Sequence, residues 1–249
     1  MLEAERHHLI LQLLSQNQTV RLHEIASETG ASESTIRRDL IELENQKKLK
    51  RIHGGAAKLQ GKLQEATMSE KTSKNLHSKQ QIGQAGASCV ESGDTIYLDA
   101  GSTAFEMIAY LPPSIIVVTN GISHTDALLE QGCKTILTGG IAKPSTKALV
   151  GRGALSSLQQ YRFDKCFLGV NGIHPEYGCT TPDEEEAQLK ELAIHLSRES
   201  YLLADHSKFQ EVAFARFADC TQTTIVTTSE SSESMHMFPK ETRWKVVQL

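Results

Sequence analysis

The sequence lacks any apolar run approaching the ~18 to 20 residues of a membrane-spanning helix. Its first residues are acidic and do not show the basic-then-apolar order of a secretory signal. The cysteines are odd in number and none belongs to a CxxC pair, so neither a disulfide framework nor a zinc site is indicated for Cys89, Cys133, Cys166, Cys179 and Cys220. We expect a cytoplasmic protein that contacts no membrane and needs no metal or cofactor.

Positive charge is scarce overall but concentrated in one segment. The 249 residues include 26 Lys and Arg against 30 Asp and Glu, a net charge of −4, which argues against general affinity for nucleic acids. Residues 34–58, by contrast, hold seven basic and three acidic side chains, a local excess of four positive charges. A basic patch on an acidic protein indicates a localised nucleic-acid contact.

The N-terminal residues predict three short helices and a hairpin. Apolar residues recur at helical spacing in residues 3–15 and again in residues 22–29. Ser32 can cap a third helix, and two extended runs flank the pair Gly54-Gly55, which suits a hairpin turn. We therefore predict a winged helix-turn-helix over residues 1–59.

The third helix carries two adjacent arginines away from its apolar stripe. Ile36, Leu40 and Leu43 recur at i, i+4 and i+7 and form the buried face, so Arg37 and Arg38 point toward solvent or a partner. In a helix-turn-helix protein the first turns of the second helix of the motif meet base edges in the major groove. Arginines there can anchor phosphates and read guanine. The alternative, a solvated basic face, fits these residues about equally well.

Two motifs shift that balance. Thr-Ile-Arg-Arg-Asp-Leu at residues 35–40 and Arg-Ile-His-Gly-Gly-Ala at residues 51–56 resemble the N-terminal module of the DeoR family of bacterial transcription regulators. The resemblance implies operator DNA as partner, and short half-sites imply at least a dimer. We expect a homo-oligomer, a dimer or a tetramer. The resemblance places the DNA contacts on Ser34, Thr35, Arg37 and Arg38 of the helix and on Lys50, Arg51 and His53 of the wing.

The rest of the chain predicts an α/β domain. Residues 60–79 are polar and weakly periodic, so we expect a linker there and a second domain over residues 80–249. In that domain short apolar runs alternate with helical segments, which indicates a mostly parallel, doubly wound sheet. The expected strands lie at 95–98, 115–118, 135–137, 165–168, 201–203 and 224–226, and the expected helices at 103–110, 123–130, 153–160 and 184–197.

Polar residues follow four of these strands. Ligands of parallel sheets bind at the carboxyl ends of the strands, and a helix start with free hydroxyls and amides favours a phosphate. Each polar group could instead be an ordinary cap or turn. Four such strand ends together favour a pocket made by Asp99, Gly101, Ser102, Thr103, Thr119, Asn120, Gly139, Gly140 and Asn171.

Three charged residues complete the predicted effector site. Glu186 is the acidic residue of a helix start that we expect to turn inward, and Lys208 follows a strand, where its charge would complement a phosphate. Lys165 belongs to a segment that, with 99–103 and 204–209, resembles the DeoR sensor domain. That domain is similar to ribose-5-phosphate isomerase and glucosamine-6-phosphate deaminase, and in regulators it binds a phosphorylated sugar. This chain departs from the family pattern at Arg152, where the family has proline, and at Ala104, where it often has threonine.

The resulting hypothesis is a repressor of a sugar-uptake or catabolic operon that a phosphorylated sugar releases from its operator. The alternative is a sugar-phosphate isomerase or deaminase with an accessory DNA-binding module, which would need a positioned carboxylate base. The carboxylates and lysines show no poised pair by spacing, so we expect no enzyme. The ten histidines match no metal-ligand spacing.

Overall fold

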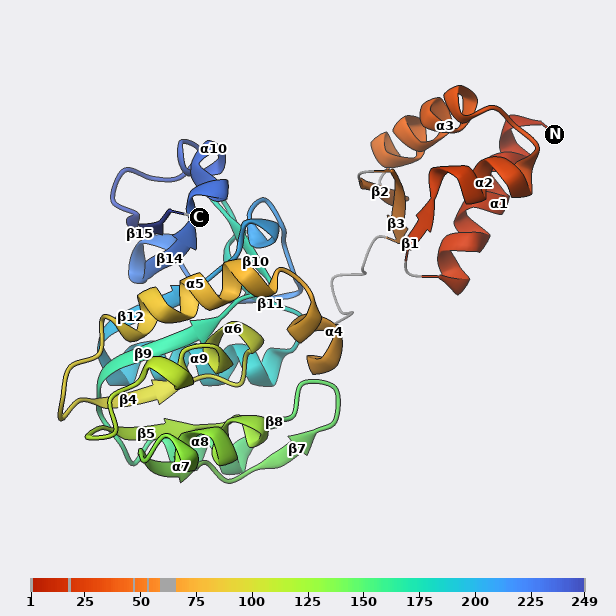
Figure 1. The fold of residues 1–249 in the computed structure, drawn as a ribbon. Coiled ribbons are helices and arrows are strands. Elements are labelled where there is room, and N and C mark those ends of the chain that lie inside the picture. Colours follow the sequence, from red (N-terminus) through yellow and green to blue (C-terminus); the bar gives the residue numbers. More distant parts are fainter. Residues whose placement is uncertain (1, 18, 47, 53, 59–65, 249) are drawn as a thin grey trace. The chain divides into compact units, whose positions relative to one another are not determined.

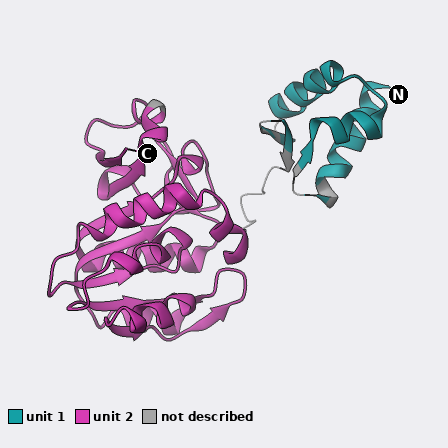
Figure 2. Ribbon diagram, in the orientation of Figure 1, with its two compact units in different colours: residues 1–61 teal, residues 62–249 magenta. Residues whose placement is uncertain are grey.

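The computed structural model describes residues 2–17, 19–46, 48–52, 54–58 and 66–248. The chain divides into two compact units, residues 1–61 and residues 62–249 (Figure 2). The division falls inside the segment predicted as a linker, residues 60–79. The later part of that segment is helical, however, because α4 (Met68–Ser73) and the start of α5 (Leu76–Ala87) lie in it.

The N-terminal unit is a winged helix-turn-helix (Figure 1). Its helices pack on a three-stranded antiparallel sheet of order β1-β3-β2. The predicted helices and hairpin are confirmed, whereas β1 follows a polar turn and is too short to show periodicity. Ile10, Ile25, Ile36 and Leu43 are fully buried between the elements. The bounds are α1 Glu3–Gln16, β1 Thr19–Arg21, α2 Leu22–Thr29, α3 Glu33–Asn45, β2 Leu49–Ile52 and β3 Gly55–Lys58.

The C-terminal unit is built on a seven-stranded sheet whose neighbouring strands are all parallel, as the sequence predicts. Its order is β15-β14-β12-β9-β4-β5-β6. The bounds are β4 Thr95–Leu98, β5 Ile116–Thr119, β6 Lys134–Leu137, β9 Phe163–Gly169, β12 Ser197–Leu203, β14 Thr224–Thr228 and β15 Arg243–Val247.

Helices cover both faces of this sheet. Successive strand residues alternate between two cores: Tyr97 packs with α8 and α9, while Ile96 packs with α5, α6 and α7. This alternation follows from the two-residue period of a strand and requires apolar side chains on both faces. The bounds are α6 Ser102–Phe105, α7 Thr125–Glu130, α8 Arg152–Leu158 and α9 Glu184–Leu196.

The remaining elements lie around the sheet. They include an antiparallel sheet of β10 Gly172–His174, β11 Gly178–Thr181 and β13 Ala215–Ala218, a hairpin of β7 Ile141–Lys143 and β8 Ala148–Val150, and a helix α10 Ser232–Met235. Single 3-10 turns occupy Ile108–Tyr110, Ile122–His124, His206–Lys208, Cys220–Gln222 and Ser229–Ser231. No helix among the described residues is long and apolar enough to cross a membrane.

The helix predicted at 103–110 is wrong in length. The α-helical part, α6, ends at Phe105, and a separate 3-10 turn follows at Ile108–Tyr110. A helix of four residues sums few peptide dipoles, so the helix-start attraction for a phosphate that the sequence suggested is small here.

Candidate functional site

The start of α3 presents its polar residues to solvent. Ser32 caps the helix by accepting a hydrogen bond from the Thr35 backbone amide at 3.3 Å, and the Ser32 hydroxyl lies 2.9 Å from the hydroxyls of both Ser34 and Thr35. Ile36, on the opposite face, is fully buried. The predicted contact residues Ser34 and Thr35 therefore lie in the first turn, held in a network that Ser32 organises.

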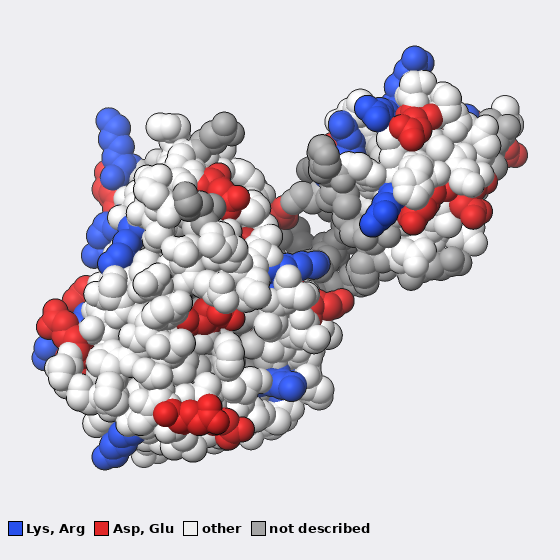
Figure 3. Space-filling model, in the orientation of Figure 1, with Lys and Arg blue, Asp and Glu red and all other residues white. Residues whose placement is uncertain are grey.

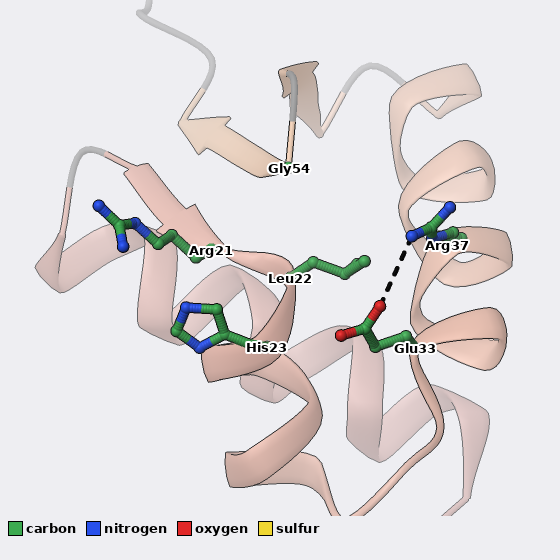
Figure 4. A pocket seen from close by; sticks show the side chains of 6 residues that line it. All are labelled: Arg21, Leu22, His23, Glu33, Arg37 and Gly54. Atoms are coloured by element: carbon green, nitrogen blue, oxygen red, sulfur yellow. Dashed lines mark ion pairs between the residues drawn. The ribbon is translucent and has the colours of Figure 1, made fainter.

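The two arginines of α3 differ in their surroundings. Arg37 forms an ion pair with Glu33 at 3.5 Å, and both side chains are more than half exposed. Arg38 is also exposed, and no carboxylate among the described residues pairs with it. Figure 3 shows Lys and Arg side chains on the surface of the N-terminal unit, with Asp and Glu between them. Arg38 is thus the less restrained of the two cations, because the Arg37 guanidinium faces Glu33 in the pocket that Figure 4 shows.

The predicted wing contacts are only partly placed. The Arg51 backbone amide donates a hydrogen bond to Glu44 at 2.8 Å, and its guanidinium lies 3.8 Å from the same carboxylate. Arg51 is thereby joined to the last turn of α3, although its side chain remains exposed. His53 and the side chain of Lys50 lie outside the described residues.

A buried ion pair fixes the orientation of α3, and sequence reasoning missed it. Asp39 accepts hydrogen bonds from Arg6 Nε at 2.8 Å and from an Arg6 terminal nitrogen at 2.9 Å. Burial of the Asp39 carboxyl would raise its pKa, but the hydrogen bonds and charge of Arg6 outweigh burial and hold the pKa below its usual value. The acidic residue of the Arg-Arg-Asp motif thus joins α3 to α1.

At the carboxyl edge of the large sheet, Asp99 is bound by the protein itself. Asp99 Oδ2 accepts hydrogen bonds from the Gly169 amide at 3.0 Å and from the Lys190 ammonium. Lys190 also donates to the Gly169 carbonyl at 3.1 Å. Both charged side chains are buried. Lys190, missed from the sequence, lies four residues after Glu186 on the inward face of α9, and that spacing was the available signal.

The predicted amides and hydroxyls next to this edge mostly tie loops together. Asn120 accepts a hydrogen bond from the Ala100 amide at 2.9 Å and donates to the Leu149 carbonyl at 3.3 Å. Thr119, fully buried, accepts from the Gly121 amide. Asn171 accepts from the Thr181 hydroxyl at 3.0 Å. These bonds hold the strand ends in place. Asn120 and Thr119 are buried and bonded to neighbouring loops, whereas the bond of the half-buried Asn171 engages only its Oδ1.

Glu186 turns inward, as expected, and meets the β7–β8 hairpin. Its carboxylate accepts hydrogen bonds from Lys143 at 2.9 Å and from Thr146 at 2.8 Å. Lys143 also lies 2.9 Å from Asp183, the residue that caps α9. The cluster therefore holds the hairpin against the start of α9.

Lys165 lies at the wrong edge of the sheet. The strand β9 spans Phe163–Gly169, and Lys165 lies near its amino end, where it pairs with Ile96. Its ammonium forms an ion pair with Asp94 at 2.6 Å, at the edge opposite Asp99. The structure therefore removes Lys165 from the predicted effector site.

Lys208 belongs to a group of lysines around a buried carboxylate. Asp205, 1% exposed, follows β12 and accepts hydrogen bonds at Oδ1 from Ser207 and Asn75, whereas its buried Oδ2 has no hydrogen-bond partner within the described chain. Burial lowers the pKa of Lys208, and the charge of Asp205 opposes this effect. Burial also lowers the pKa of Lys79 to about 8, again against the charge of Asp205.

Several positive charges meet around Asp205, opposed by that carboxylate and, more weakly, by Glu106 and Glu211. Lys79 donates a hydrogen bond to the Lys71 carbonyl at the end of α4, and the positive charges of Lys71 and Lys74 both lower the pKa of Lys208. Sequence reasoning missed Lys79 because it ends the segment predicted as a linker. Several partly buried ammonium groups that lie close together favour the binding of an anion between them.

Small residues and hydroxyls lie at the neighbouring strand ends. Ser102 and Thr103 are buried at the start of α6, on which α4 and α5 pack. Gly101 leaves room beside the Gly169 backbone, and Gly140 has a positive φ of 122°. Gly139 is exposed beside it.

A cavity of about 250 Å³ lies apart from these predicted effector residues. It lies between α6, the following 3-10 turn and α7, and none of its lining residues belongs to the predicted site: Phe105, Ile108, Ala109, Ala127, Glu130 and Gln131.

Comparison with known proteins identifies both units. A model described as the DeoR-like helix-turn-helix domain matches residues 6–61, and one described as the DeoR C terminal sensor domain matches residues 74–230. The uncharacterized HTH-type transcriptional regulator FruR of Bacillus subtilis is 47% identical over 249 residues, 99% of each chain. The lactose phosphotransferase system repressor of Staphylococcus aureus is 33% identical over 89% of this chain and 90% of its own.

Among solved structures, ribose 5-phosphate isomerase A of Methanocaldococcus jannaschii matches 55% of each chain with 15% identity and a TM-score of 0.41, which is too remote to bear on activity. The relatives that match along nearly the whole chain are named as regulators, so the isomerase or deaminase alternative is set aside. The chain belongs to the DeoR family of DNA-binding transcription regulators.

Proposed function

We propose that this protein represses an operon for sugar uptake or catabolism and leaves its operator when a phosphorylated sugar binds the sensor unit. The lysines around Asp205 are the observation that carries this proposal. They concentrate positive charge at the carboxyl edge of the sheet, where β12 and β9 end side by side with Leu203 opposite Gly169. Burial partly dehydrates the ammonium groups of Lys79 and Lys208, and a phosphate group would offset their charge.

The neighbouring groups suit the sugar part of such a ligand. The hydroxyls of Ser102 and Thr103 and the orphaned oxygen of Asp205 can bond sugar hydroxyls, which both donate and accept. We assign the phosphate to Lys79 and Lys208 and the sugar to this polar edge. Relatives with sugar-related names, such as the lactose phosphotransferase system repressor, support a carbohydrate ligand.

On the DNA side we propose that Arg37 and Arg38 read or anchor the operator, with Ser34 and Thr35 on the backbone. Short half-sites require two recognition helices, so we propose that the working form is at least a dimer. Binding of the sugar phosphate must then favour an arrangement in which two such helices no longer match the half-site spacing, because a ligand shifts an equilibrium only by its differential affinity for the two states.

A thermal-shift screen tests the ligand class. Aldose and ketose monophosphates are compared with the same sugars unphosphorylated and with inorganic phosphate. A ligand present at about 100 times its Kd adds roughly 2.7 kcal/mol to the free energy of unfolding and raises Tm visibly. We expect at least one sugar monophosphate to raise Tm while its free sugar does not. Equal shifts with phosphorylated and free sugars, or none with any sugar phosphate, would contradict the proposal.

A further inference from the structure

The helix α4 is the first described element of the sensor unit, and the chain connects it through residues 59–65 to the N-terminal unit. It comprises only Met68–Ser73, and none of its residues is buried. Within the sensor unit it lies against the β7–β8 hairpin, α5 and α6 (Figure 1). An element with so little buried surface is held largely by its hydrogen bonds and can detach at a low cost in free energy.

The start of α4 is attached to the loop of the β7–β8 hairpin. The Met68 amide donates a hydrogen bond to the Ser145 carbonyl at 2.8 Å. The next residue of the loop, Thr146, donates to Glu186 of α9 at 2.8 Å. The backbone bond of Met68 therefore fixes the start of α4 to a loop that α9 holds in place.

The end of α4 is attached to the lysine group around Asp205. Lys79 of α5 donates a hydrogen bond to the Lys71 carbonyl. Asn75, between α4 and α5, donates to Asp205 Oδ1 at 3.0 Å and has a φ of 52°, a left-handed conformation that asparagine adopts more readily than most residues. The groups that hold the end of α4 are thus the ones to which we assign the effector, with its phosphate on Lys79 and its sugar on Asp205.

A bound phosphate competes with α4 for Lys79. The Lys71 carbonyl is neutral, whereas a phosphate dianion attracts the ammonium by charge as well as by hydrogen bonding. Burial opposes the charged form of Lys79, which lowers its pKa to about 8, and the negative charge of a phosphate offsets that effect. The ammonium therefore turns toward the phosphate, and the end of α4 loses a hydrogen bond.

We propose that α4 is the element through which the effector acts: it is held between the hairpin and Lys79 in the unliganded protein, and a bound phosphate takes Lys79 from it, so that α4 leaves the Ser145 carbonyl. This inference rests on the proposed function and names the part of the sensor unit that responds. Because the chain is continuous, release of α4 frees the point at which each N-terminal unit is attached. Two such units then lose the fixed separation that two half-sites require.

Hydrogen exchange of the full chain follows α4 directly. The probes are inorganic phosphate and the aldose and ketose monophosphates of the thermal-shift screen, and each probe that raises Tm is used. We expect a bound sugar monophosphate to speed exchange of the amides of residues 66–74, although binding ordinarily slows exchange by stabilising the folded state. The same sugar without phosphate should leave this exchange unchanged. Slower or unchanged exchange of these residues with a bound sugar monophosphate would overturn the proposal.

The Met68→Pro variant removes the amide that donates to Ser145 and leaves the loop intact. Proline suits the first residue of a helix, where its fixed φ is already helical. Thr67, with a φ of −62° and a ψ of 159°, already has the extended conformation that the residue before a proline adopts. Met68→Ala is the matched control, because it shortens the same side chain and keeps the amide.

We expect Met68→Pro to bind the sugar monophosphate about fivefold more tightly than wild type. Loss of one backbone hydrogen bond raises the population of the released state by about that factor, and the apparent affinity for a ligand rises with the fraction of protein in the state that binds it. Affinity for operator without sugar phosphate should change by less than about twofold, since the held state still predominates. Met68→Ala should match wild type. Isothermal titration calorimetry measures the Kd for the sugar phosphate.

Fluorescence anisotropy supplies the DNA measurement, with two labelled duplexes. One duplex is selected by the wild-type protein from a random-sequence library, and the other is its scrambled version. Half-release of the selected duplex should need about fivefold less sugar monophosphate in Met68→Pro than in wild type or Met68→Ala.

Unchanged or weaker binding of the sugar monophosphate by folded Met68→Pro would overturn the proposal, because a merely structural bond predicts no tighter binding. Glu70→Ala serves if the proline variant does not fold. The exposed Glu70 carboxylate caps the start of α4 by accepting from the Thr67 amide at 2.7 Å, and its loss should tighten binding about twofold.

Two failures are distinct. If no sugar monophosphate binds the wild-type protein, the proposed function itself fails. If a sugar monophosphate binds and releases the selected duplex, but Met68→Pro and Glu70→Ala both behave as wild type, only the role of α4 fails.

Discussion

Replacing Arg38 by alanine is expected to lower affinity for the selected operator by about 30-fold and to leave affinity for scrambled DNA within a fewfold of wild type. A bidentate contact to guanine contributes roughly 1–3 kcal/mol to discrimination. Arg38 is the better candidate for this contact because Arg37 is held by Glu33, while Arg38 is exposed without a described carboxylate partner. Anisotropy titrations with both duplexes at one salt concentration give the ratio.

The Arg38→Lys variant is the control for charge. It keeps a cation at the same position but loses the two-pronged donor geometry, so the operator preference should fall nearly as far as in Arg38→Ala. Equal weakening of both duplexes in Arg38→Ala would show a phosphate contact instead. That result would move base reading to another residue of α3.

Replacing Lys208 or Lys79 by methionine is expected to raise the Kd for the sugar phosphate found in the screen by about 30-fold each, since each change removes a charge-assisted hydrogen bond. Methionine approximates the length of the lysine chain without its charge. Because burial disfavours the charged Lys79 ammonium despite the charges of Asp205 and Glu106, Lys79→Met should not lower Tm. Isothermal titration calorimetry measures the Kd, with exposed Lys134→Met as the matched control, which should bind as wild type.

The same site gives a pH dependence. The pKa of Lys79 is lowered to about 8 by burial, so a phosphate binds best below that pH, where the lysine is charged. Affinity should fall as the pH rises from about 7 to 9, a range in which a sugar phosphate stays dianionic. The Lys79→Met variant should show a flatter profile. The unliganded protein follows the opposite trend: a lysine whose folded pKa lies below its unfolded value destabilises at low pH, and that cost fades above about 8.

A wild-type affinity that is flat over this range, or a Lys79→Met variant with unchanged Kd, would place the phosphate elsewhere. A lowered Tm in Lys79→Met together with weaker binding would indicate a structural role only. In that case the Lys208→Met variant shows whether the phosphate binds here, because Lys208 is less buried than Lys79 and its replacement disturbs the fold less.

The elements that could be predicted are those whose apolar residues repeat with a clear period. The stripe of Ile36, Leu40 and Leu43 predicted α3, and Ser32 predicted its first residue. The buried strands β4 and β12 were equally visible as apolar runs. The strands β10, β11 and β13 were not, because they are short and partly polar. β10 and β11 form a local hairpin, and β13 pairs with β11 from a distant part of the chain, which no local pattern encodes.

The sequence predicted where in the fold the candidate site lies, but not how its side chains are bonded. The strand-end rule indicated the edge that carries Asp99 and Asp205. Lys165, by contrast, was assigned from the family resemblance, and it lies near the amino end of β9, at the opposite edge of the sheet. The sequence also did not reveal which charged side chains form ion pairs with one another in the folded protein. Asp99 resembled a ligand contact until Lys190 was found bonded to it. Whether a polar side chain still has bonding capacity depends on partners far away in sequence.

The most direct test of the account is to titrate the preformed operator complex with the sugar phosphate identified by the screen and to follow the anisotropy of the labelled duplex. The account predicts that the phosphorylated sugar releases the DNA, that the same sugar without phosphate does not, and that the Lys208→Met complex resists release while binding DNA normally. A sugar phosphate that binds the protein but leaves the complex intact or tightens it, or equal release by the free sugar, would contradict the account.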